Sequence, residues 1–362
     1  MSDVIEYKCP NCGGAIAFNI ATQNLKCPFC DTEYELEALK AYDDSLKKEA
    51  DDFVWNTEAG GQWTEGETAG LKVYICQSCA GEIVGDDTLG SSRCPYCDST
   101  IVMKEQFAGD LKPDYVIPFK LEKEEAKKAF AEHLLGKKLL DRRFVDENKI
   151  DEIKGVYVPF WLFDTALDAD VSYKCSNSKS SRSGDYIITK TDYYLCNVEG
   201  SMGFDRIPVD GSSKMADDLM ESLEPFDSSD AVPFQTAYMA GYMANRYDVE
   251  LEESIDNINR RVKGSAEDVF MDQVTGFETK TVSSSRIKLK DSESKYALYP
   301  IWTLKINWKG KLYTFAMNGQ TGKFVGDQLP ENKAKSRMVS IVSTVVGTVA
   351  GLVAAFAIGI IF

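Results

Sequence analysis

The stretch Tyr7–Asp31, YKCPNCGGAIAFNIATQNLKCPFCD, has a second copy in Tyr74–Asp98, YICQSCAGEIVGDDTLGSSRCPYCD. Each copy holds two Cys-x2-Cys pairs separated by fourteen residues, and equivalent positions lie 67 residues apart. Four thiolates at this spacing suit a tetrahedral Zn²⁺, because each pair presents two sulfurs and the intervening hairpin closes the site. The sequence therefore predicts two tandem zinc ribbons and two Zn²⁺ ions. The predicted ligands are Cys9, Cys12, Cys27 and Cys30 for one ion, and Cys76, Cys79, Cys94 and Cys97 for the other.

A redox function is the alternative interpretation of a Cys-x2-Cys pair. Redox pairs of the thioredoxin kind need one reactive pair at the start of a helix in a βαβ unit. Here the pairs come in matched sets, and the segments Ala15–Phe18 and Glu82–Gly85 have the character of short strands. A complete set of four cysteines leaves no open coordination position, which favours a structural role over a catalytic one.

The end of the chain is strongly apolar. Met338–Phe362 contains no charged residue in 25 positions, and a helix of that length spans about 37 Å, enough for a bilayer core. Lys333, Lys335 and Arg337 precede it within the basic segment 331–337. By the positive-inside tendency, we expect a single-pass, tail-anchored protein of the cytoplasmic membrane with its N-terminal domains in the cytoplasm. The N-terminus has no signal-peptide character, which agrees with that orientation.

Small residues recur at every fourth position of this apolar segment. They are Ser343, Gly347, Gly351, Ala355 and Gly359. Small residues at this spacing let a second helix backbone approach closely, which suggests self-association or pairing with a partner helix. Glycine and alanine are also common in membrane helices, so helix pairing is a hypothesis.

Charge and composition restrict the function classes. The chain has 362 residues, 44% of them hydrophobic, and a formal net charge of −16. Its length allows two or three domains with real cores. Residues 1–35 carry Lys8 and Lys26 against five acidic side chains. Nucleic-acid binding needs clustered Lys and Arg, so the chain lacks the usual electrostatic footprint of a nucleic-acid-binding protein.

The predicted fold class is multidomain: two small β zinc ribbons, a mixed α+β domain and one C-terminal transmembrane helix. The expected domains are ribbon 1 at 1–35, a helical and Gly/Thr/Glu-rich linker at 36–71, ribbon 2 at 72–104, the α+β domain at 105–330, the basic segment at 331–337 and the transmembrane helix at 338–362. Within the α+β domain we expect strands at Asp114–Leu121, Gly155–Asp170 and Asp185–Glu199, helices at Glu122–Lys138, Lys214–Leu223 and Glu252–Val262, and a Ser-rich loop at Ser176–Ser183.

An aromatic pattern occurs twice in the predicted α+β domain. Tyr157–Phe163, YVPFWLF, is echoed by Tyr299–Leu304, YPIWTL. One interpretation is two similar strands that enter one core, since buried aromatic side chains supply much of a core's area. The other is an aromatic groove for a peptide or a lipid.

No catalytic constellation emerges from the sequence, and we expect a protein that is not an enzyme. The single histidine, His133, lies beside Leu134 on an expected helix, where a packed or surface histidine is usual. No nucleophile lies in a recognisable elbow motif. Cys175 and Cys196 are left over and could pair across adjacent strands, although reduced thiols are the default in the cytosol.

The layout resembles bacterial membrane proteins of the transcription factor IIB-type zinc-ribbon group. The resemblance rests on the paired ribbons, on the segments VIPF at Val116–Phe119 and VPFWLFD at Val158–Asp164, and on YPIW…WKGK…NGQTGK at Tyr299–Lys323. It covers nearly the whole chain. The segment Cys76–Ala80, CQSCA, departs from the usual CPxCG form, so the geometry of that knuckle is in question.

The resemblance implies a membrane anchor in a membrane-stress system, which recruits phage-shock-protein-A-like and SPFH-type (flotillin-like) proteins to the membrane. We therefore expect a membrane-anchored zinc-ribbon scaffold. Two alternatives stay open. One is a zinc-ribbon protein that binds nucleic acid or acts in transcription while tethered to the membrane, which the acidic charge disfavours. The other is a membrane-linked enzyme with a polar pocket within residues 105–330.

Overall fold

The computed structural model describes residues 7–46, 50–86, 93–106, 111–134, 137, 140, 141, 144 and 150–330. These residues form two compact units. The first unit is built from described residues within Met1–Glu58, Leu162–Val209 and Glu252–Ser294. The second is built from those within Ala59–Trp161, Asp210–Leu251 and Lys295–Phe362. The long strands β8 (Lys154–Ser183) and β12 (Thr279–Trp308) contribute residues to both units.

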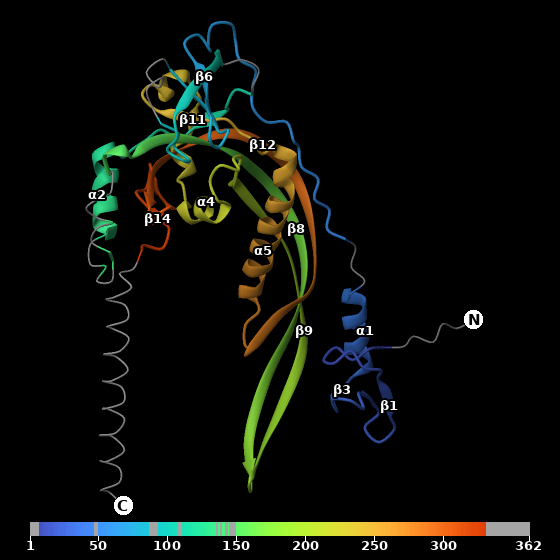
Figure 1. The fold of residues 1–362 in the computed structure, drawn as a ribbon. Helices are drawn as coiled ribbons and strands as arrows, with labels where there is room; N and C mark the ends of the chain where they lie inside the picture. The colour runs from blue at the N-terminus through green and yellow to red at the C-terminus, as the bar shows by residue number, and fades with distance from the viewer. Residues whose placement is uncertain are drawn as a thin grey trace, which may run out of the picture. The chain divides into compact units, whose positions relative to one another are not determined.

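The first cysteine motif lies in the first unit, on a small antiparallel sheet of its own (Figure 1). Its strands are β1 (Ala17–Asn19), β2 (Asn24–Lys26) and β3 (Glu33–Tyr34), in the order β1-β2-β3. Helix α1 (Leu36–Leu46) follows directly and buries Leu39. Sheets of this size bury little apolar area, so they need another source of stability.

The rest of the first unit combines long strands with one helix. β9 (Tyr186–Asp210) pairs with β8, and β12 pairs with β8 on its other side. Helix α5 (Ile255–Gln273) lies beside these strands (Figure 1) and buries side chains at every fourth position from Ile258 to Phe270. The phenol of Tyr173 on β8 donates a 2.6 Å hydrogen bond to the Glu267 carbonyl of this helix. The helix is longer than the predicted Glu252–Val262.

The predicted Ser-rich loop at Ser176–Ser183 is wrong, because these residues belong to β8. Cross-strand hydroxyl pairs hold them to β9: Ser178 lies 2.9 Å from Thr191, and Ser180 lies 2.8 Å from Thr189. Serine clusters usually mark loops, but hydroxyl pairs across two strands stabilise a ladder.

The second cysteine motif lies in the second unit and forms part of a large sheet, to which strands of both units contribute. The motif supplies β4 (Lys72–Cys76), β5 (Glu82–Gly85) and β6 (Ile101–Gln106). The sheet has eleven strands in the order β10-β7-β12-β8-β11-β5-β4-β6, with β13, β14 and β9 joined from the side. β11 (Met243–Asn245) connects the motif to the rest, since Ala244 pairs with Val84 and Asn245 with Ile83. The remaining strands are β7 (Tyr115–Val116), β10 (Val232–Pro233), β13 (Lys311–Asn318) and β14 (Phe324–Gly326).

Two helices accompany this sheet. α2 (Lys123–Leu134) buries the predicted face of Ala126, Phe130 and Leu134, and Phe130 meets Phe315 of β13 edge to face at 5.0 Å. α4 (Asp217–Leu223) is short and buries Met220 and Leu223. Both occupy parts of the chain where helices were predicted.

The repeated aromatic segments are core, and the alternative of an aromatic groove is wrong for them. Tyr157, Phe160, Trp161, Tyr299 and Trp302 are all buried. Phe160 stacks on Tyr299 with ring centroids 4.7 Å apart, and the Trp161 indole donates a 2.9 Å hydrogen bond to the Val249 carbonyl. In both strands the large aromatic side chains of the repeated segment are buried, as expected for residues that supply much of a core's area.

The predicted fold class needs correction. The described chain is mostly β-sheet, with strands running through the region predicted as a mixed α+β domain. No helix among the described residues is long and apolar enough to cross a membrane. The predicted transmembrane helix Met338–Phe362, its stripe of small residues and the basic segment 331–337 lie outside those residues. The single-pass membrane localisation depended on that helix and is corrected with it.

Candidate metal centres

Both cysteine motifs use the same backbone turns. In the first motif, the Cys9 amide donates to the Gly14 carbonyl at 2.8 Å, and the Gly13 amide donates back to the Cys9 carbonyl at 2.8 Å. The turn at Cys27–Asp31 repeats this exchange, with the Cys27 amide donating to Thr32 and the Asp31 amide to Cys27. The second motif has the same four bonds at positions 67 residues later. We call each Cys-x2-Cys turn a knuckle. Each knuckle points its two sulfurs to one side of the turn.

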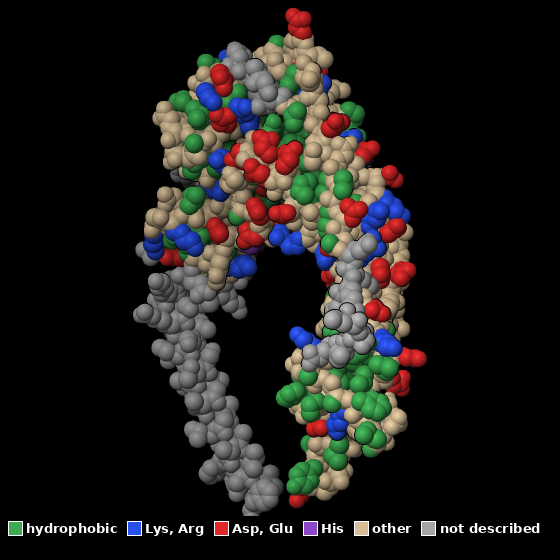
Figure 2. All heavy atoms as spheres, turned by 90° about the vertical axis from the view of Figure 1, so that its right-hand side faces the viewer, with side chains coloured by type: hydrophobic (Ala, Val, Ile, Leu, Met, Phe, Trp, Pro, Cys, Tyr) green, Lys and Arg blue, Asp and Glu red, His purple; other side chains and the backbone are tan. Residues whose placement is uncertain are grey.

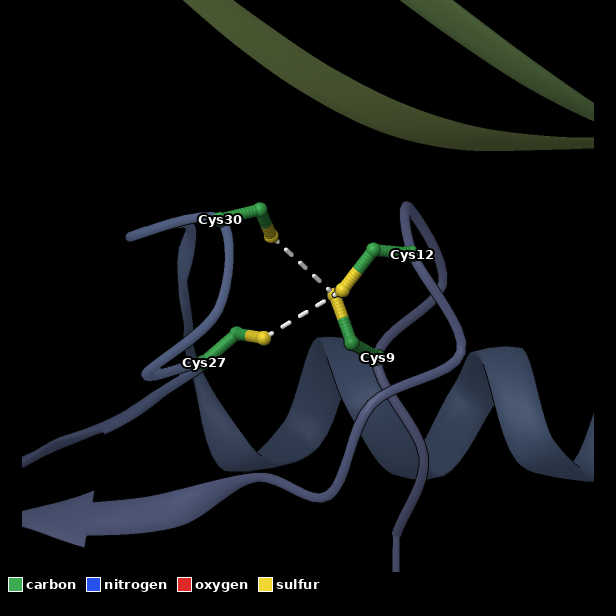
Figure 3. A group of neighbouring side chains, drawn as sticks. All are labelled: Cys9, Cys12, Cys27 and Cys30. Carbon is green, nitrogen blue, oxygen red and sulfur yellow. Dashed lines mark hydrogen bonds between the residues drawn. The ribbon is translucent and has the colours of Figure 1, made fainter.

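The knuckles bring four sulfurs together in each motif. In Figure 3 the side chains of Cys9, Cys12, Cys27 and Cys30 point toward one another. The Cys9–Cys30 and Cys12–Cys27 sulfur distances are 3.6 and 3.4 Å. In the second motif Cys76–Cys97 and Cys79–Cys94 are 3.4 and 3.6 Å apart. A disulfide needs about 2.05 Å, so these are free thiols. All sulfurs of one group lie within 4.8 Å of one another, and each group could hold a metal ion.

The unusual knuckle Cys76–Ala80 keeps the standard turn. Ala80 adopts φ +54°, and Gly13 at the equivalent position of the first motif has φ +72°. The substitution of glycine by alanine therefore leaves the geometry intact, although a left-handed conformation costs a side-chain-bearing residue about 1–2 kcal/mol. The sequence could not decide this point, because the turn type depends on the whole knuckle.

This leads to a prediction for a reciprocal pair of variants. Ala80→Gly relieves the left-handed strain and should stabilise the second unit by about 1 kcal/mol. Gly13→Ala should destabilise the first motif by a similar amount, since nothing lies within 4 Å of the added Cβ and only the backbone strain acts. Denaturant unfolding at constant metal concentration would measure both. Destabilisation by Ala80→Gly would show that the Ala80 methyl group makes a contact that outweighs the strain.

A hydroxyl residue stabilises the thiolate form of the last cysteine in each motif. Hydrogen bonds from the side chain and the backbone of Thr32 lower the pKa of Cys30 to about 6, and the Thr32 hydroxyl lies 3.3 Å from this sulfur. Burial raises the pKa of Cys97, but hydrogen bonds with Ser99, and then with Cys76 and Cys79, together lower it to about 6. Thr32 and Ser99 are equivalent residues of the two motifs. A thiolate at neutral pH is the form that binds metal.

The first group has one phenol and one lysine beside it. The Tyr34 hydroxyl lies 3.2 Å from the Cys9 sulfur, and burial, then this contact, raises the pKa of Tyr34. Lys174 of β8 donates a 2.9 Å hydrogen bond to the Pro10 carbonyl. Burial lowers the pKa of Lys174, while the negative charge of the Cys9 and Cys30 thiolates raises it.

The second group is flanked by two lysines from other strands of its unit. Lys154 donates to the Cys94 carbonyl at 3.2 Å and to the Asp98 carboxylate at 3.0 Å. Burial lowers the pKa of Lys305, whereas Asp327 and the thiolate forms of Cys94, Cys97 and Cys79 favour its charged form. A metal dication with four thiolates carries a net charge of −2, which neighbouring cations offset. Lys154, Lys174 and Lys305 give no local signal in the sequence, because they are far from the motifs along the chain.

Other predicted residues lie apart from the two groups. His133 packs against Phe324, with ring centroids 4.8 Å apart, and burial lowers the pKa of its imidazole. Cys175 and Cys196 are free thiols on the paired strands β8 and β9. Burial, and then the neighbouring Cys196, raises the pKa of Cys175 to about 11, which keeps this thiol protonated at neutral pH.

A polar hollow of about 430 Å³ lies over β8, β9 and β12 in the first unit. Asp168 on its wall is paired with Lys290 and accepts a 2.7 Å hydrogen bond from Ser201. The Lys290 contact, and then Ser201, lowers the pKa of Asp168. This hollow lies within residues 105–330, the region in which the alternative of an enzyme predicted a polar pocket, and Asp168 on its wall is held in its ionised form.

Comparison with known proteins places the chain in a family. The Bacillus subtilis (strain 168) protein described as "Uncharacterized protein YdjG" is 32% identical over 323 residues, and the match covers 89% of each chain. This chain belongs to the YdjG family. The shared length is too great to fall within one unit, so the YdjG relationship extends over both. No family model matches the chain, and no solved structure matches it.

Proposed function

We propose that each cysteine group binds one Zn²⁺ in a closed structural site, and that the chain is a non-enzymatic scaffold for partner proteins. The observation that carries the zinc assignment is the set of four thiol sulfurs in each motif, 3.4–3.6 Å apart across the two knuckles. A tetrahedron with Zn–S distances of about 2.3 Å has sulfurs about 3.8 Å apart, close to this spacing. All-sulfur sites select zinc or iron–sulfur chemistry over hard cations.

Bound zinc would supply folding energy rather than chemistry, since four protein ligands leave no position for a substrate or water. The first motif is small enough to need this additional stability. Its three strands have two or three residues each, and Phe18, Ile20 and Phe29 on its surface are exposed. Metal binding stabilises small modules that cannot bury enough apolar area.

The proposal of a scaffold function rests on the large apolar side chains that are exposed on the first motif. Large apolar side chains on a metal-stabilised module are typical of surfaces that contact other proteins. The partner class follows from the family resemblance in the sequence, which implies phage-shock-protein-A-like and SPFH-type proteins. The net charge of −16 favours protein partners over nucleic acid.

A crosslinked pull-down with the full chain as bait tests this proposal. We expect mass spectrometry to identify proteins of these two classes with the wild-type chain, and a loss of them with Cys27→Ser, which removes a ligand of the exposed motif. Cys196→Ser, which removes a thiol outside both groups, is the matched control and should behave as wild type. Recovery of only ribosomal, polymerase or nucleic-acid components, with a steep salt dependence, would contradict the scaffold function.

A further inference from the structure

Both motifs have an aromatic residue at the same position, but its exposure to solvent differs between them. Phe29 is 74% exposed, whereas the equivalent Tyr96 is 5% exposed. Each ring lies over the equivalent glycine of its own motif. A Cβ on Gly14 would come within 2.5 Å of the Phe29 ring, and a Cβ on Gly81 within 3.2 Å of the Tyr96 ring. The rings are therefore seated alike, and the difference in exposure comes from what covers them from outside.

The difference extends over the whole second knuckle. In the first motif Pro28 and Cys30 are exposed as well, while in the second Pro95 is buried and Cys97 is partly buried. The second motif is covered by segments of its own unit, including the first residue of β8, Lys154. Figure 2 faces the side of the first unit that carries the first motif, where several apolar side chains stand uncovered in the lower part of the view.

The second Cys-x2-Cys turn of each motif ends in an aspartate, and the two aspartates differ in their ion pairs. Asp98 is bridged within its motif by Arg93 at 3.4 Å and from outside by Lys154 at 3.0 Å. Asp31 has the equivalent internal bridge, from Lys26 at 3.2 Å, but its side chain is 83% exposed, against 23% for Asp98. The outer side of the Asp31 carboxylate is thus open, where Asp98 receives a lysine.

We propose that the second knuckle of the first motif, Cys27–Asp31, docks a segment of a partner protein that carries a lysine or arginine next to an apolar side chain. The basic group would pair with the Asp31 carboxylate as Lys154 pairs with Asp98. The apolar group would cover Pro28 and Phe29 as the second unit covers Pro95 and Tyr96. This rests on the proposed scaffold function and identifies the chemistry of its partner. A second copy of the chain is a poorer occupant, because two chains of net charge −16 repel each other.

The test selects random linear peptides from a displayed library on the full zinc-loaded chain. We expect enrichment of peptides with a Lys or Arg beside large apolar residues. Their dissociation constants should rise about tenfold or more with Phe29→Ser and with Asp31→Asn, which removes the charge but tolerates the left-handed turn at φ +58°. Ile187→Ser is the matched control, since Ile187 is 76% exposed on β9 of the same unit, and it should bind like wild type.

Two zinc ions retained by every variant would show that the knuckles remain folded. Phe29→Tyr, which installs the residue of the second motif, should keep most of the affinity. Peptides that bind Phe29→Ser and Asp31→Asn as tightly as wild type would overturn the assignment of this face while leaving the scaffold function standing. A library that yields no binders would overturn the docking site, and Phe29-dependent dimerisation would assign the face to a second copy instead.

Discussion

Cys94→Ser should destabilise the second unit by more than about 4 kcal/mol, whereas Cys27→Ser should leave that unit's stability within about 0.5 kcal/mol of wild type. Cys94 is fully buried in a motif whose strands β4, β5 and β6 belong to the eleven-stranded sheet. Loss of its metal would release β5 from β11. Cys27 belongs to a separate three-stranded sheet in the other unit, so its loss should unfold the first motif selectively.

Intrinsic fluorescence separates the two effects. Of the five tryptophans, only Trp55 lies in the first unit. Denaturant unfolding followed by tryptophan emission therefore reports mainly on the second unit, and amide hydrogen exchange over residues 7–46 reports on the first motif. Equal losses of stability for the two variants would show that the motifs do not differ in their coupling to the sheet.

Trp161→Ala should destabilise the second unit by about 3–5 kcal/mol, the usual cost of deleting a buried aromatic side chain. Trp161 is almost fully buried, and its ring lies against Tyr247 and Tyr296 at centroid distances of 5.3 and 5.2 Å. Its indole N–H also satisfies the Val249 carbonyl. Trp161→Phe keeps most of the packing and leaves that carbonyl unpaired, so we expect a smaller loss of about 1–3 kcal/mol.

Denaturant titration of both variants, with Ile187→Ser as the exposed control, would measure these effects. The control should change stability by less than about 0.5 kcal/mol. If Trp161→Ala were as stable as the control, the aromatic strands would not form the core of this unit.

The grouping of the cysteines could be predicted from the sequence, because it depends on residues close together in the chain. Spacing alone predicted which eight thiols meet, and the repeat at an offset of 67 predicted that both motifs use the same turns. The buried face of α2 could also be predicted, from the periodic spacing of its apolar residues. In these cases the signal lies within a few turns of chain.

The surroundings of the motifs could not be predicted, because they depend on contacts far apart in the chain. The pairing of Val84 with Ala244 gives no local signal, and neither does the approach of Lys154 to Asp98. The two motifs therefore looked equivalent in sequence, although one is part of a large sheet and the other is exposed. The strand Ser176–Ser183 was missed for a related reason, since its serines are stabilised by hydroxyl partners on β9.

The two zinc sites are tested most directly by the metal content of the purified chain. Elemental mass spectrometry would measure it for wild type, Cys27→Ser, Cys94→Ser and the control Cys196→Ser. We expect two zinc ions per chain for wild type and control, and one for each ligand variant. Two zinc ions in Cys27→Ser, or iron with sulfide in place of zinc in the wild type, would contradict this expectation.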